Sequence, residues 1–178
     1  MLVKLGIVIS LDIAYPAFLA PEIRQRLQRV AFGGCLAVLF DGTPAMLAHN
    51  PWPAQWARVC HEAVAEAGKT DEIVYFMRAG AAGSQRWCPM MWAGDQNVDW
   101  SEDDGLPSVV TSAISLAMSG MGLQHSDIGG YTTLYSLKRT KELFLRWAEF
   151  AACTPMMRTH EGNRPADNWQ FDSDDETL

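Results

Sequence analysis

Short apolar runs alternate with longer stretches of helical periodicity along this chain. Residues 73–77 and 89–93 are apolar runs, each followed by a glycine, and such runs are typical of buried strands. Apolar positions favour helices over residues 54–67, 107–118 and 137–152, the last with apolar side chains at three- and four-residue spacing. Strands that alternate with helices predict an α/β fold, in which helical crossovers connect parallel strands.

Polar side chains stand where the predicted strands end. Arg78 and Asp95 follow the two apolar runs, and Asp127 and His160 occupy the corresponding points further along the chain. The catalytic and binding residues of a closed (β/α)8 barrel lie at the carboxyl ends of its strands. One polar residue after a strand indicates only a hydrated loop, whereas four in register favour a functional site.

Helix boundaries support this arrangement. Residues 101–104 (Ser-Glu-Asp-Asp) are expected to cap the helix over 107–118 and to place negative charge in its first turn. Gly120 is expected to end that helix. Glu142 and Arg146 are spaced to form an ion pair on the outer face of the next helix.

The length limits how much of a barrel the chain can form. Its 178 residues, 48% of them hydrophobic, are enough for a buried core. A complete eight-stranded barrel takes roughly 250 residues. We therefore predict a partial (β/α)8 TIM barrel that comprises the carboxyl half of the barrel.

Charge and cysteine usage narrow the classes of partner. The net charge of −7 and the scattered Lys and Arg residues argue against a nucleic-acid partner. The four cysteines show no zinc-ligand spacing, so we expect neither a metal nor a cofactor, and reduced thiols in a cytoplasmic protein. No apolar run approaches a membrane span, so no membrane partner is expected. Residues 1–20 faintly resemble a signal peptide, but Asp12 and Pro16 interrupt the pattern.

Five motifs occur in the order and spacing of one enzyme family. They are Asn-Pro-Trp-Pro (50–53), Arg-Ala-Gly (78–80) with Gly-Ser-Gln-Arg-Trp (83–87), Trp-Ala-Gly-Asp-Gln (92–96), His-Ser-Asp-Ile-Gly-Gly-Tyr (125–131) and Met-Arg-Thr-His-Glu-Gly-Asn-Arg-Pro (157–165). Through them, residues 41–178 resemble the catalytic barrel of glycoside hydrolase family 31, the α-glucosidase family. Residues 96–100, 131 and 159–165 look most like the α-sulfoquinovosidases within it, so a small-molecule α-glycoside is the expected substrate.

The resemblance implies a role for each candidate residue. Asp95 matches the general acid/base of a retaining glycosidase, and Trp92 is suited to supply an apolar wall that desolvates its carboxyl group. Arg78, Asp127 and His160 match positions that bind the sugar ring. Tyr131 stands where neutral α-glucosidases usually carry Phe, and it matches a tyrosine that takes part in sulfonate recognition.

The family nucleophile has no match in the chain. The nearest segment, residues 30–36, places Ala31 where the nucleophilic aspartate belongs, and Asp41 falls in the following loop. Residues 1–36 therefore match poorly, and residues 37–178 form the expected partial glycoside hydrolase domain. We expect the chain alone to be inactive. A neutral-sugar α-glucosidase and a non-catalytic sugar-binding remnant are the alternatives, and the sequence leaves the oligomeric state open.

Overall fold

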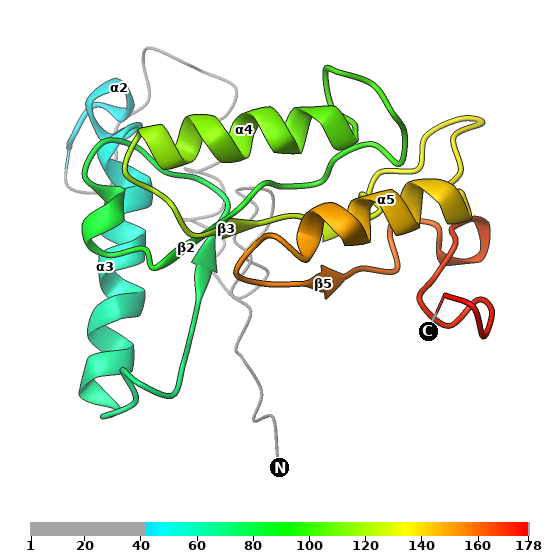
Figure 1. Ribbon diagram of the computed structural model, residues 1–178. Coiled ribbons are helices and arrows are strands. Elements are labelled where there is room, and N and C mark those ends of the chain that lie inside the picture. The colour runs from blue at the N-terminus through cyan, green and yellow to red at the C-terminus, as the bar shows by residue number, and fades with distance from the viewer. Residues whose placement is uncertain (1–41, 178) are drawn as a thin grey trace. The chain divides into compact units, whose positions relative to one another are not determined.

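The computed structural model describes residues 42–177, which fall into two compact units that divide between Pro89 and Met90 (Figure 1). The first unit contains α2 (Ala45–Ala48), α3 (Pro51–Glu66), β1 (Phe76–Met77) and the 3-10 helix η1 (Ser84–Arg86). The second contains β2 (Met90–Trp92), α4 (Leu106–Met118), β3 (Gln124–His125), β4 (Asp127–Ile128), α5 (Lys141–Ala151), β5 (Arg158–Thr159) and the 3-10 helix η2 (Pro165–Asp167). The segment at residues 30–36 and Asp41 lie outside the described residues.

Helix α3 dominates the first unit. It begins three residues earlier than predicted, because Pro51 and Pro53 fall in its first turn, where a missing N–H leaves no hydrogen bond unmade. Its inner face buries Ala57 and Cys60. The predicted strand over residues 73–77 shortens to the two residues of β1.

The strands of the second unit pair in parallel. Met91 of β2 aligns with Gln124 of β3, and Asp127 of β4 aligns with Arg158 of β5. Helix α4 lies in the chain between β2 and β3, and α5 between β4 and β5. The prediction of parallel strands with helical crossovers is thereby confirmed.

The core of the second unit forms where α5 packs against β4 and α4. Its buried residues are Val98, Leu106, Val109, Ile128, Leu143, Phe144, Trp147 and Ala151. Trp147 is fully buried, and its indole Nε1 donates a hydrogen bond to Ser126 Oγ at 2.8 Å. The one polar atom of this large side chain is thus satisfied inside the core.

The start of α4 differs from its prediction. The N-cap residue is Gly105, which makes no side-chain capping bond, and the first turn carries no acidic residue. Ser101 instead bonds with its backbone N–H and its hydroxyl to the Asp99 carboxylate, at 2.9 and 2.7 Å, in a turn before the helix. A Cβ at Gly105 would lie 2.5 Å from the Asp99 carbonyl oxygen, so only glycine fits beside this turn. The predicted cap is wrong, whereas Gly120 does follow the end of the helix with φ +83°.

The predicted ion pair on α5 also differs. Arg146 bonds to Glu149 at 2.8 Å, and the structure shows no ion pair with Glu142. The hydrogen bond to Glu149 raises the pKa of the Arg146 guanidinium, and the charge of Glu142 adds to that shift. At the other end of the helix, the Thr140 hydroxyl caps α5 by accepting a hydrogen bond from the Leu143 N–H at 3.2 Å.

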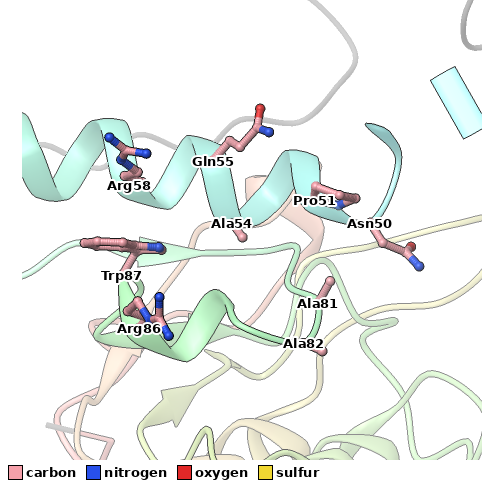
Figure 2. A pocket seen from close by; sticks show the side chains of 9 residues that line it. All are labelled: Asn50, Pro51, Ala54, Gln55, Arg58, Ala81, Ala82, Arg86 and Trp87. Atoms are coloured by element: carbon pink, nitrogen blue, oxygen red, sulfur yellow. The ribbon is translucent and has the colours of Figure 1, made fainter. Parts of the chain in front are cut away.

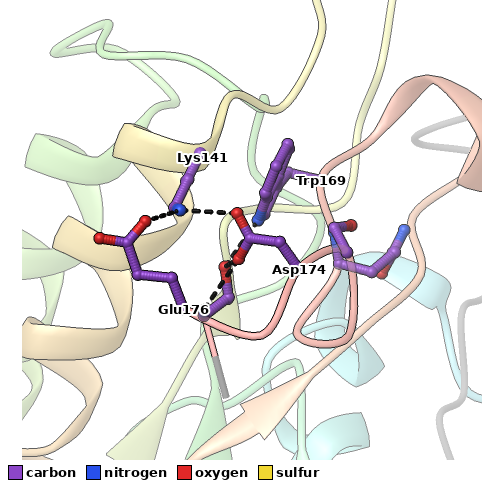
Figure 3. Close-up of polar contacts among 7 residues, drawn as sticks. Lys141, Trp169, Asp174 and Glu176 are labelled. Atoms are coloured by element: carbon purple, nitrogen blue, oxygen red, sulfur yellow. Dashed lines mark hydrogen bonds and ion pairs between the residues drawn. The ribbon is translucent and has the colours of Figure 1, made fainter.

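The first residue of α5 also holds the carboxyl-terminal segment (Figure 3). Lys141 Nζ bonds to Asp174 at 2.7 Å and to Glu176 at 2.6 Å. The same ammonium lies 5.6 Å from the centre of the Trp169 ring.

Within residues 42–177, no helix has the length and apolarity needed to cross a membrane.

Truncation of the core tests this packing. Leu143 is 1% exposed, and we expect Leu143→Ala to lower the free energy of unfolding by about 2–5 kcal/mol, because the cavity would close only in part. Met118 is 85% exposed at the end of α4, and Met118→Ala should change that free energy by under about 0.5 kcal/mol. Urea denaturation followed by tryptophan fluorescence measures both, and equal effects of the two variants would refute the packing described.

Candidate active site

A buried carboxylate lies where β2, β4 and β5 approach one another. The Oδ1 atom of Asp127 accepts a hydrogen bond from the indole Nε1 of Trp92 at 3.1 Å and also binds the guanidinium of Arg158. Arg158 lies over the Trp92 ring at 5.4 Å, and its Nε donates to His125 Nε2 at 3.3 Å. Four side chains from four strands therefore hold one another in place.

Burial governs the charge state of Asp127. Its side chain has no exposed surface, and this desolvation raises the pKa of its carboxyl group above the usual value. The charges of Arg158 and His160 offset part of that shift, and the negative charge of Asp95 adds to it. Within the described residues, the Oδ2 atom of Asp127 is buried without a hydrogen-bond partner. One acceptor oxygen of the cluster is therefore left without a donor among these residues.

His125 is the neutral member of this cluster. Its ring is fully buried beside Arg158, and burial together with that positive charge lowers the pKa of His125 to about 4. At neutral pH the imidazole is therefore uncharged, and its Nε2 can accept the Arg158 hydrogen bond.

Asp95 lies on a loop that is bonded to a second loop along its length. Gln96 O accepts hydrogen bonds from the N–H groups of Tyr131 and Thr132 at 2.9 and 2.8 Å, and the Thr132 hydroxyl donates to Asp95 O at 2.8 Å. Asn97 and Thr132 also form a parallel bridge. The backbone that carries Asp95 is thus fixed relative to the backbone that carries Tyr131, while the Asp95 side chain stays partly exposed.

Tyr131 and His160 form an aromatic pair. Their ring centres are 4.8 Å apart at an interplanar angle of 87°, an edge-to-face contact. His160 Nδ1 accepts a hydrogen bond from the Gly162 N–H at 3.0 Å. The neutral ring therefore carries its proton on Nε2 and keeps this N–H as a donor.

The second unit brings five of the six sequence-predicted residues together: Trp92, Asp95, Asp127, Tyr131 and His160. Arg78 directly follows β1 in the first unit, where its side chain is exposed. Asp127 differs slightly from its prediction, because it is the first residue of β4 rather than the residue after a strand. Trp92 is predicted to supply an apolar wall beside Asp95, and in the structure its indole N–H bonds to Asp127.

Sequence reasoning missed His125, Arg158 and Arg139. Each is polar and each is largely or fully withdrawn from solvent, with Arg139 only 2% exposed. Their place inside the motifs at residues 125–131 and 157–165 was the available signal for His125 and Arg158. Arg139 gave none, because it stands in a basic pair just before a helix cap and looks like surface charge.

The first unit contains a pocket of about 440 Å³ between α3 and the loop that ends in η1 (Figure 2). Arg58, Arg86 and Trp87 line it, and no residue predicted for the site does. Arg58 already pairs with Glu62 at 2.6 Å. Across residues 42–177, no group of three or more His, Cys, Asp or Glu side chains is arranged to hold a metal ion.

Comparison of the sequence with known protein families identifies one family. The model for the glycosyl hydrolases family 31 TIM-barrel domain matches residues 22–177. The chain therefore belongs to glycosyl hydrolase family 31. The predicted fold class, a partial (β/α)8 barrel, is confirmed by this match and by the structural likeness described below.

Curated relatives include two sulfoquinovosidases. The chain is 66% identical over 172 residues to that of Escherichia coli (strain K12), a match covering 91% of this chain and 25% of the relative. It is 53% identical over 140 residues to that of Agrobacterium fabrum, covering 79% of this chain and 21% of the relative. Alpha-xylosidase A of Aspergillus niger is 36% identical over 101 residues, covering 52% of this chain and 13% of the relative. The chain thus spans about a quarter of the length of the sulfoquinovosidases it matches.

A solved structure has the same fold. A family 31 sulfoquinovosidase from E. rectale, in complex with the aza-sugar inhibitor IFGSQ, superposes with a TM-score of 0.76 at 58% identity. That match covers 79% of this chain and 21% of the other.

The buried histidine predicts a pH dependence of stability. Because the folded pKa of His125 lies at about 4, below its unfolded value of 6.5, its contribution is complete above pH 6.5 and is lost as pH falls toward 4. That loss is roughly 3 kcal/mol. The raised pKa of Asp127 acts in the opposite direction, so the His125 component is isolated by comparison with His125→Asn.

Urea denaturation at pH 7 and pH 4.5 measures this component. We expect His125→Asn to lose less stability on acidification than the unchanged chain. His49→Asn, a change in an exposed histidine, is the control and should follow the unchanged chain. Parallel pH profiles for His125→Asn and the unchanged chain would contradict the assignment.

Proposed function

We propose that this chain supplies the acid/base half of a retaining α-glycoside hydrolase that acts on α-sulfoquinovosides. The observation that carries the proposal is the gathering of Asp95, Asp127, Tyr131 and His160 at one edge of the second unit: Tyr131 and His160 are in ring contact, and the charges of Asp95 and His160 act on the Asp127 carboxyl group. The similarity to two sulfoquinovosidases supports the choice of substrate class.

Asp95 performs the proton transfers. Its protonated carboxyl donates to the glycosidic oxygen as the bond to the anomeric carbon breaks, and its carboxylate later takes a proton from the water that attacks the glycosyl intermediate. The intermediate forms on a second carboxylate, about 5 Å from the first in retaining enzymes. This chain contains no match to that nucleophile. In an active enzyme, the nucleophile must therefore come from a segment outside this chain.

The neighbouring groups suit a polyol ring. The buried Oδ2 of Asp127 is an acceptor and the Nε2–H of His160 is a donor, so together they can bind adjacent hydroxyl groups. Arg78 joins this set on the strength of the family motif. Burial gives a bond to Asp127 more weight than it would have in water.

Tyr131 provides the preference for a sulfonate. Its ring meets His160 edge-on, so its position is tied to a residue of the proposed sugar site. A phenol hydroxyl can donate to a sulfonate oxygen, or to a water bound to it, whereas Phe cannot.

The role of Asp95 can be tested in a hybrid protein. In it, residues 42–178 of this chain replace the part of the E. coli sulfoquinovosidase that they match, so the hybrid keeps the preceding segment of that enzyme. We expect the hybrid to hydrolyse an aryl α-sulfoquinovoside and Asp95→Asn to lower its kcat/KM by about 10²–10⁴-fold, because general acid/base catalysis is lost. Asp103→Asn changes an exposed carboxylate just before α4 and should have no effect. Full activity of Asp95→Asn would reject the assignment, and turnover by the 178-residue chain alone would reject the need for an outside nucleophile.

Substrate preference tests Tyr131. In the same hybrid, Tyr131→Phe should lower the ratio of kcat/KM for the aryl α-sulfoquinovoside over the aryl α-glucoside by about fivefold, the worth of one net hydrogen bond. A hybrid that prefers the glucoside, with Tyr131→Phe silent, would establish the neutral-sugar α-glucosidase instead. Binding without hydrolysis, insensitive to Asp95→Asn, would establish the sugar-binding remnant.

A further inference from the structure

Arg139 is a buried arginine whose hydrogen bonds run to backbone carbonyl groups. It is 2% exposed, Nε donates to Gly129 O at 3.1 Å, and its terminal nitrogens donate to Gly130 O and Trp169 O. Burying a guanidinium is costly unless its donors are satisfied. The buried guanidinium therefore holds the two residues that precede Tyr131 by binding their carbonyl oxygens.

The glycine turn is confined from both sides. A Cβ at Gly129 would lie 2.5 Å from Arg139 Cδ, and a Cβ at Gly130 would lie 2.8 Å from Asn97 O. Both glycines have positive φ, at +85° and +77°. The turn therefore lies between the Arg139 side chain and the loop that carries Asp95, with no room for a side chain at either position.

The same arginine also contacts the network under the His160 loop. Its backbone N–H donates to Asn168 Oδ1 at 3.2 Å, and Asn168 Nδ2 donates to Glu161 O at 3.3 Å. The Tyr131 carbonyl in turn accepts from the Asn163 N–H at 3.2 Å. The backbones on either side of the Tyr131–His160 ring contact are thus joined through Arg139 and Asn168.

We propose that Arg139 is a positioning residue, which fixes the Gly129–Gly130 turn and thereby sets the edge-to-face contact of Tyr131 with His160. Arg139 acts through the backbone and touches no substrate. Its consequence for sulfonate preference rests on the function proposed above, whereas its consequence for the ring contact does not.

The ring contact can be measured by NMR in the full 178-residue chain at pH 8. The chain has four histidines, and the ring current of Tyr131 in the edge-to-face contact shifts the ring protons of His160. The Tyr131→Leu variant gives the chemical shift of the His160 ring protons in the absence of that ring current. We expect Arg139→Lys, which cannot make three bonds in the same plane, to move the His160 resonance toward the Tyr131→Leu position.

Arg146→Lys is the matched control, an exposed arginine on α5 that should leave His160 unchanged. A folded Arg139→Lys with the His160 shift of the unchanged chain would overturn the proposal. If Arg139→Lys does not fold, Gly129→Ala, whose Cβ would lie 2.5 Å from Arg139 Cδ, separates the turn from the Arg139 side chain and should displace the His160 resonance in the same direction. An unchanged His160 in that variant would overturn the proposal equally.

Activity of the hybrid provides the second readout. Arg139→Lys should lower the sulfoquinovoside-to-glucoside ratio of kcat/KM by about fivefold, and Tyr131→Phe should then cause no further loss in the Arg139→Lys background. Additive losses would mean that Arg139 does not act through Tyr131. If the hybrid hydrolyses neither substrate, the proposed function fails, while the His160 shift still decides the role of Arg139.

Discussion

The edge of the second unit depends on the burial of one carboxylate. Asp127 has no exposed surface, and removing a carboxylate from water is tolerated only if hydrogen bonds and an opposite charge replace the water. Trp92 and Arg158 meet that requirement at Oδ1, and the stacking of Arg158 on Trp92 links their positions. A neutral His125 completes the cluster without adding a second positive charge. The ends of β2, β3, β4 and β5 are thereby held together by side chains as well as by the backbone.

The loops that carry Asp95 and Tyr131 are also bonded to each other. The Asp95 loop and the Tyr131 loop share backbone bonds through Gln96 O, and Gly130 allows the close approach to Asn97 O. The reactive groups of a glycosidase must be held within a fraction of an ångström to be effective. In this chain the positions of the two loops are fixed by backbone contacts, which depend on Gly130 and on the buried side chains of Arg139 and Asn168.

Much of this arrangement could be read from the sequence. The apolar periodicities predicted the three long helices to within a few residues, and polar residues after strands indicated the edge where the candidate site lies. The sequence could not reveal the strand at Gln124–His125, since its buried side chains are polar and satisfied by tertiary contacts. Nor could it reveal the part played by Arg139 or the pairing of Arg146 with Glu149, because neither choice is encoded in local spacing.

The central claim is that Asp95, Tyr131 and His160 face one sugar-binding site. A crystal structure of the hybrid protein with the aza-sugar inhibitor IFGSQ, which the E. rectale enzyme binds, tests it most directly. The account predicts that all three side chains lie within hydrogen-bond distance of the inhibitor, directly or through one water. An inhibitor bound with none of these side chains in its surroundings would contradict it.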